Sequence, residues 1–80
     1  MGNWEQKLAG DEVIRVGKNA IIGRNGAILE ISINGTNWET IHTFPPAEGE
    51  FFIIDLPTAT YLRLTGGGAW AISLYNEMSG

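Results

Sequence analysis

Glycine recurs through this sequence so often that helix signals are nearly missing. The chain has eleven glycines in 80 residues, and a glycine inside a helix costs about 1 kcal/mol relative to alanine. Between the glycines lie short runs rich in isoleucine, threonine and aromatic residues, which favour pleated strands. The pattern therefore predicts an all-β chain, folded as a compact antiparallel β-sandwich of the jelly-roll-like or immunoglobulin-like kind.

Seven to eight short strands are expected, because apolar runs alternate with residues that form turns. The expected ranges are Glu12–Val16, Ala20–Gly23, Ala27–Ile33, Trp38–Phe44, Glu50–Leu56, Thr60–Thr65 and Ala69–Tyr75, with a weaker strand at Trp4–Leu8. The expected turns are Gly17-Lys18-Asn19, Asn25-Gly26, Asn34-Gly35, Leu56–Ala59 and Gly66–Gly68.

The stretch "ISINGTNWETI", residues 31–41, predicts two strands folded about a tight turn. Asn-Gly is the strongest short-range signal for a β-hairpin, because both residues tolerate a positive φ. A second Asn-Gly pair, Asn25-Gly26, precedes it by nine residues. The two pairs together predict successive hairpins.

Alternation along the strands indicates which side chains face the core. One predicted core face holds Leu29, Ile31 and Ile33, and others hold Leu62 with Leu64 and Trp70 with Ile72 and Leu74. The run "FFIID" differs, because it is apolar on both faces. Phe52, Ile54 and Leu56 are expected to fill the core. Phe51 and Ile53 then need another cover, either a second layer or a neighbouring subunit, which favours oligomerisation.

Size also favours a partner chain. At 80 residues the chain is expected to form one domain over residues 1–80, and so small a domain buries only about 60% of its unfolded surface. Small domains usually need disulfides, a metal or a partner. With no cysteine and one histidine, neither disulfides nor a histidine-rich zinc site can form within one chain. Self-association is the remaining way to stabilise so small a domain.

Charge and hydropathy exclude other classes of protein. The net charge is −4 and the five basic residues are scattered, so phosphate-dominated binding of nucleic acid is not expected. No run approaches the roughly 18 apolar residues of a membrane span. No secretion signal is visible, which predicts a soluble protein made in a cytoplasm.

Catalytic and metal-binding patterns are also missing from the sequence. His42 is the only imidazole, no serine- or cysteine-centred motif accompanies it, and an ordinary half-buried histidine is the favoured interpretation. The nine carboxylates show no spacing typical of a glycosidase pair or an EF-hand loop. The glycine-rich "TGGGAW" lacks the ending of a phosphate loop. We therefore expect no enzyme activity, no metal and no cofactor.

Two short stretches resemble known β-sandwiches. The hairpin "ISINGTNWETI" resembles a strand–turn–strand of discoidin-like carbohydrate-binding domains, with matching residues at Ser32, Gly35 and Trp38. The later "DLPTATYLRLTGG", residues 55–67, resembles a strand pair of the same domains. The later stretch also resembles small β-rich virion proteins of tailed phages, which serve as head decoration, fibre or adaptor proteins. The short, acidic, cysteine-free composition fits this second family better.

The phage resemblance implies a structural protein that acts through contacts rather than chemistry. It implies a homotrimer that binds a larger protein assembly, such as a capsid or tail, and that is located in the virion after synthesis in the host cytoplasm. The candidate contact residues are Trp4, Trp38, Phe51 and Ile53. The alternative is a small carbohydrate-binding module whose exposed aromatic residues, Trp38, Tyr61 and Tyr75, stack on sugar rings.

Overall fold

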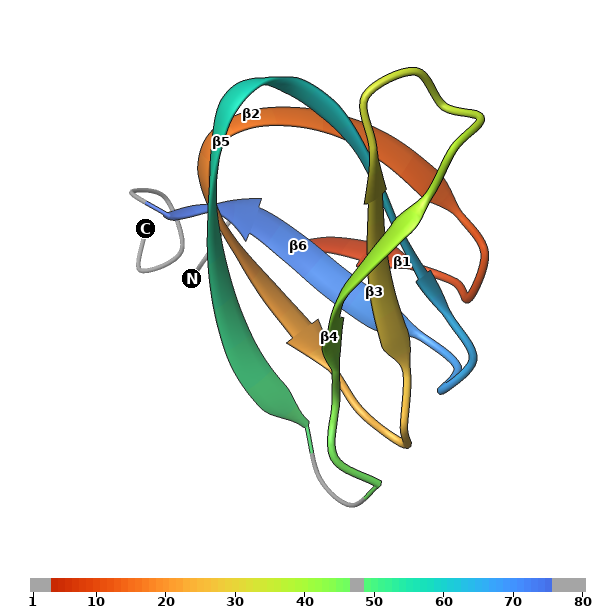
Figure 1. Ribbon diagram of the computed structural model, residues 1–80. Helices are drawn as coiled ribbons and strands as arrows, with labels where there is room; N and C mark the ends of the chain where they lie inside the picture. The colour runs from red at the N-terminus through yellow and green to blue at the C-terminus, as the bar shows by residue number, and fades with distance from the viewer. Residues whose placement is uncertain (1–3, 47–48, 76–80) are drawn as a thin grey trace.

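The computed structural model describes residues 4–46 and 49–75 of the chain. Within them six strands form one open antiparallel sheet in the order β1-β6-β2-β5-β3-β4 (Figure 1). The strands are β1 (Glu5–Lys7), β2 (Glu12–Gly23), β3 (Ile28–Ser32), β4 (Glu39–Thr43), β5 (Glu50–Thr65) and β6 (Trp70–Leu74). The predicted all-β antiparallel class is confirmed. The described strands are fewer than the predicted seven to eight, because two pairs of predicted strands are continuous.

The first continuous strand is β2, in which the predicted turn at residues 17–19 does not form. Gly17 adopts a φ of 83°, and the pairing of β2 with β5 shifts register between Arg15 and Gly17. Such a bulge bends a strand without ending it. Lys18 and Asn19 then pair with β5 as ordinary strand residues. The prediction of a turn was wrong because a glycine at positive φ serves a bulge as well as a turn.

The second continuous strand is β5, in which the predicted turn at residues 56–59 is instead the bulge that lies opposite Val16 of β2. Arg15 pairs with Thr60 and Gly17 pairs with Leu56, so three residues of β5 lie opposite Val16 alone. Pro57 lies within this unpaired stretch. Its missing N–H therefore removes no hydrogen bond from the sheet, and the strand continues past it.

Because β2 and β5 bend at this shared corner, the two halves of the single sheet face each other and enclose the core. Figure 1 shows β2 and β5 arching over the other strands. Ile21 and Ile72, on one side of the corner, belong to the same buried cluster as Leu29 and Leu64 on the other. The cluster also contains Ala27, Phe44, Leu56, Leu62 and Trp70. The predicted inward faces are confirmed for Leu29, Leu62, Leu64, Trp70 and Ile72, which are at most 3% exposed.

Asn25-Gly26 forms the predicted turn but not a hairpin. Both residues have positive φ, 57° and 75°, and the Ala27 amide donates to the Arg24 carbonyl at 3.0 Å. The strands on either side, β2 and β3, are not neighbours, because each pairs with β5 instead. The turn thus carries the chain from one half of the curved sheet to the other.

Candidate functional site

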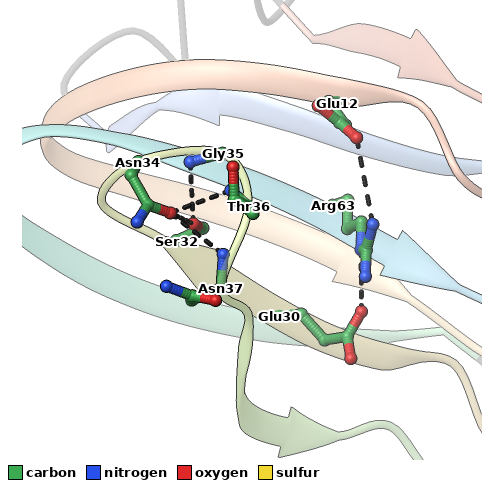
Figure 2. Close-up of polar contacts among 8 residues, drawn as sticks. All are labelled: Glu12, Glu30, Ser32, Asn34, Gly35, Thr36, Asn37 and Arg63. Atoms are coloured by element: carbon green, nitrogen blue, oxygen red, sulfur yellow. Dashed lines mark hydrogen bonds and ion pairs between the residues drawn. The ribbon is translucent and has the colours of Figure 1, made fainter.

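The connection between β3 and β4 is a six-residue loop, residues 33–38, organised around the side chain of Asn34 (Figure 2). The Asn34 Oδ1 accepts hydrogen bonds from the amides of Thr36 at 2.8 Å and Asn37 at 2.9 Å. It also accepts from the hydroxyl of Ser32 at 3.0 Å, and the Gly35 amide donates to the Ser32 Oγ at 2.8 Å. Side-chain oxygens therefore accept hydrogen bonds from the backbone amides of a loop that takes no part in strand pairing. We call it the Asn34 loop.

The Asn34 loop corrects the predicted tight turn. The strands β3 and β4 do pair, as expected for a hairpin. Asn34, however, does not have the positive φ that a two-residue turn of this kind requires, whereas Gly35 does, at 78°. The hydrogen bonds to the Asn34 side chain stabilise a wider loop in place of the two-residue turn.

Two aromatic contacts fix the Asn34 loop to the outer surface of the sheet. The backbone of Gly35 lies over the ring of Tyr61, so close that a Cβ there would be 3.2 Å from the ring. The ring of Trp38, at the other end of the loop, lies 3.9 Å from the guanidinium carbon of Arg63. Tyr61 and Arg63 are two residues apart in β5 and so project from the same face. The loop is thus held at both ends.

Arg63 is itself held by acidic side chains of the two flanking strands (Figure 2). Its Nε donates to the Glu30 Oε1 at 2.8 Å, and its Nη1 lies 3.8 Å from the Glu12 Oε2. Glu12 and Glu30 both pair with Arg63 in register, one from β2 and one from β3. The cation stacked on Trp38 is therefore neutralised and fixed in position.

An open depression of about 410 Å³ lies beside the Asn34 loop. It is lined by Ile31, Ser32, Ile33, Asn34, Asn37 and Glu39. Ile33 was predicted to face the core with Leu29 and Ile31, but it lies past the end of β3 and is 80% exposed. The depression therefore combines aliphatic, amide and carboxylate groups. These groups can contact a polar ligand or a protein side chain but include no nucleophile with a base beside it.

A second surface lies on the outside of the other half of the sheet, and we call it the outer apolar face. The rings of Trp4 and Phe51 meet there, with centroids 5.8 Å apart. Phe51 is 56% exposed and Ile53 41% exposed. In register between them and the edge strand lie Ile22 beside Ala71 and Ala20 beside Ser73. Three of these four residues are small and buried, and they form the floor of the face.

The core side of "FFIID" is as predicted. Leu56 is buried, and Phe52 and Ile54 pack against the core cluster. His42 stacks on Phe52 with ring centroids 4.3 Å apart, and its Nε2 lies 2.8 Å from the Glu50 Oε1. His42 is half-buried, as the sequence indicated, and joins β4 to the first residue of β5.

The structure separates the predicted contact residues into two groups. Trp4, Phe51 and Ile53 share the outer apolar face, whereas Trp38 lies on Arg63 in the other half of the sheet. Of the predicted sugar-stacking residues, Trp38 and Tyr61 lie under the two ends of the Asn34 loop. Tyr75 is remote from them, with the Lys18 ammonium 4.8 Å from its ring centroid.

Sequence reasoning missed the residues that organise both surfaces. Alternation with Leu62 and Leu64 gives Arg63 an outward direction and no more, and nothing in its neighbourhood along the chain indicates Trp38, Glu12 or Glu30. The floor of the outer apolar face was missed because Ala20, Ala71 and Ser73 come from two strands. A signal was present in the glycine after Asn34, since a close approach to a ring requires a residue without a Cβ.

Within residues 4–46 and 49–75, no group of three or more histidine, aspartate or glutamate side chains is placed to hold a metal ion. No helix among the described residues is long and apolar enough to cross a membrane. No protein-family model matches the sequence, and neither the curated proteins nor the solved structures include a match.

Proposed function

We propose that this chain is a non-enzymatic interaction protein that self-associates through the outer apolar face. The observation that carries the proposal is the exposure of Phe51 and Ile53 beside Trp4, because contiguous apolar groups on a soluble surface mark contact sites. Aromatic residues in the middle of a contact supply much of its binding energy.

Association through a face fits this sheet better than association through strand edges. The edge strand β1 has three residues, and the other edge strand, β4, contains a bulge at Ile41, where the register with β3 shifts. Short and bulged edges resist the addition of another strand. The contact is therefore built from side chains rather than from backbone pairing.

The assembly that this contact would serve is a virion, on the resemblance to small tailed-phage proteins. We propose a homotrimer whose subunits bind a capsid or tail, with the curved sheet acting as a minimal β-sandwich. Cyclic symmetry would cover one outer apolar face per subunit and leave the Asn34 loop free. That loop, rigid and carrying the exposed Ile33, is our candidate contact with the larger assembly.

The test is native mass by light scattering over a range of concentrations, for the wild type and for Phe51→Asp with Ile53→Asp. We expect an oligomer for the wild type and a folded monomer for the double variant. The matched control is Ile14→Asp with Val16→Asp, which also changes two exposed apolar residues of one strand, 57% and 55% exposed, in another part of the sheet. An unchanged oligomer in the folded 51/53 variant would refute the contact assignment.

A carbohydrate-binding module is the second candidate, supported by the placement of Trp38 and Tyr61 on one face beneath the Asn34 loop. Such a module would stack a sugar on the Trp38 ring and bond it through the side-chain amides of Asn34 and Asn37. Titration of a glycan panel should then change tryptophan fluorescence in the wild type and not in Trp38→Ala. A flat wild-type response across the panel would count against this function.

A further inference from the structure

We propose that the first half of β5, residues 50–56, is a docking edge for an extended peptide segment of another protein, which adds to the sheet as a further strand. The peptide has apolar residues in its middle and a basic residue at each end. The inference goes beyond the proposed self-association, which uses the side chains of the outer apolar face. Strand addition of this kind binds through main-chain hydrogen bonds and reads the peptide sequence through side chains.

The corner in β2 and β5 gives the sheet two edges besides those of β1 and β4. β5 pairs with β2 along residues 50–56, but its pairing with β3 begins only at Tyr61. β2 pairs with β5 along residues 12–15, but its pairing with β6 begins only at Asn19. Figure 1 shows the first half of β5 at the left of the view. Within the described part of the chain, each of these two half-strands therefore has a partner strand on one side only.

Three of the four edges carry a feature that resists strand addition. β1 has three residues, and the pairing of β4 with β3 is bulged. The edge at residues 12–15 carries Arg15 on the same face as Val13, which packs against the core, and the Arg15 Nη2 lies 2.6 Å from the Glu5 Oε1. A charge that points inward from an edge strand hinders a neighbouring strand. These three edges are therefore protected.

The first half of β5 has none of these protecting features. Residues 50–56 pair with β2 without a break in register, and they include no lysine, arginine or proline. In an antiparallel pair, every second residue points its N–H and C=O away from the partner strand. These outward groups form an unpaired row along the free side, which is a template for another strand. An edge that stays open where the other three are protected indicates a partner.

The side chains on the two faces of this edge specify the middle of the peptide. On the outside, Phe51 and Ile53 are 56% and 41% exposed, and side chains of an added strand would lie directly beside them. On the inside, Phe52 and Ile54 pack against the core cluster but are only partly buried. Apolar residues on both faces of the peptide would therefore complete the burial of both pairs.

The charges at the ends of the edge specify the ends of the peptide. Glu50 begins the edge, with its side chain 42% exposed beside His42, and Asp55 is exposed near the other end. Lys18 is opposite Asp55 in register, but its ammonium lies over the ring of Tyr75. A second copy of this edge would bring further carboxylates, whereas a peptide with basic ends complements those present. Charge therefore favours the peptide over a second copy.

The test is amide hydrogen exchange, followed by NMR on the isotope-labelled full chain. The probe is the capped peptide Lys-Val-Ile-Thr-Ile-Val-Lys, which reads the same in both directions. In the free chain, every second amide of residues 50–56 should exchange fast, and the probe should slow these same amides. Uniformly slow exchange in the free chain, or fast amides that millimolar probe leaves unchanged, would overturn the proposal. Amides that slow with protein concentration alone would assign the edge to a second copy instead, which also overturns it.

Two N-methylated probes separate strand addition from a side-chain contact with the outer apolar face. Methylation of the third and fifth amides blocks one side of the peptide backbone and leaves the other side free to pair. Methylation of the fourth and fifth amides blocks both sides with the same number of methyl groups. The second probe should bind at least about tenfold more weakly than the first, because it loses main-chain hydrogen bonds whichever side it presents. Equal affinity of the two probes would refute strand addition.

A protein variant supplies the protection that this edge lacks. Ile53→Lys places a basic residue in the middle of the edge and should weaken probe binding by about tenfold. The matched control is Ile53→Thr, which keeps a β-branched residue without charge and should bind the probe more tightly than Ile53→Lys. Equal binding by the two folded variants would contradict the assignment. These measurements are independent of self-association, since the native mass of the unliganded chain does not enter them.

Discussion

At the scale of single residues, the side chains of Asn34 and Arg63 each hold several segments of the chain together. Asn34 gathers three donors on one carbonyl oxygen and so satisfies a loop without strand pairing. Arg63 connects three strands and carries a tryptophan on its flat face. The Asn34 contacts use one oxygen atom, and the Arg63 contacts use one planar guanidinium group. Conservative substitutions of these residues and of their partners should therefore show how much each contact contributes to stability.

Asn34→Ala should lower the free energy of unfolding by about 1 kcal/mol, because it removes the acceptor of three hydrogen bonds, two of which are exposed to water. Asn34→Asp should be close to neutral, since these hydrogen bonds use only the Oδ1 and a carboxylate oxygen accepts at least as well. Urea denaturation of both variants measures the difference. Equal losses would show that the Asn34 Nδ2 matters in a way these bonds do not explain.

Glu30→Gln should destabilise the fold more than Glu12→Gln. Glu30 lies 2.8 Å from Arg63 with its side chain 20% exposed, whereas Glu12 lies 3.8 Å away with its side chain 47% exposed. We expect a loss of about 1 kcal/mol for Glu30 and less than about 0.5 kcal/mol for Glu12, since exposed pairs contribute little. Thermal melts at low salt would test the order, and a reversed order would mean that Glu12 is the main partner of Arg63.

At the scale of elements, local signals predicted the existence of strands better than their limits. The period-two pattern of Leu62 and Leu64 identified the inward face because burial on one side requires it. The same glycine and proline that suggested strand ends at residues 17 and 57 instead lie at one corner where two strands bend together. Whether such a residue ends a strand or bends it depends on pairing between residues some forty positions apart, and no local pattern contains that information.

The candidate site was predictable to a similar degree. The run "FFIID" predicted that Phe51 and Ile53 face outward, because both of its faces are apolar. Both side chains are exposed in the structure. Trp38 was grouped with them because the sequence cannot say which half of a curved sheet a loop joins. The partner of Trp38, Arg63, is 25 positions away along the chain and is reached only through the pairing of β3 with β5.

The glycine run between β5 and β6 offers a test at this scale. All three glycines have positive φ, between 75° and 82°, but only Gly67 is crowded: an added Cβ would collide with the Arg24 carbonyl oxygen and come within 2.7 Å of the Ala27 Cβ. Gly66→Ala and Gly68→Ala should each lower stability by about 1–2 kcal/mol through strain alone. Gly67→Ala should lower it by a further 1 kcal/mol or more, roughly. Equal melting temperatures for the three variants would contradict the contact between this run and the turn at Asn25.

At the scale of the whole molecule, one sheet supplies both sides of its own core and leaves an apolar surface outside. The buried core cluster has nine members among the described residues and is small, and domains of this size have narrow stability margins. Association would add to that margin, since a ligand or subunit that binds only the native state raises its stability by mass action.

The melting temperature of the wild type should therefore rise with protein concentration. We expect an increase of several degrees between about 1 and 100 µM, whereas the folded Phe51→Asp with Ile53→Asp variant should melt at one temperature throughout. Differential scanning fluorimetry with the native tryptophans as the reporter is sufficient. A wild type with no concentration dependence would argue against self-association through any surface.

The strand order has a consequence for synthesis. Only β3 and β4 are consecutive in the chain and also adjacent in the sheet, whereas β2 must wait for β5, and β1 for β6. As the chain leaves the ribosome, the β3–β4 hairpin can close early, and every other strand stays without a partner until most of the chain has emerged. We expect such a nascent chain to fold late and all at once, with its apolar strands exposed to chaperones, or to other copies emerging nearby, until the final strand arrives.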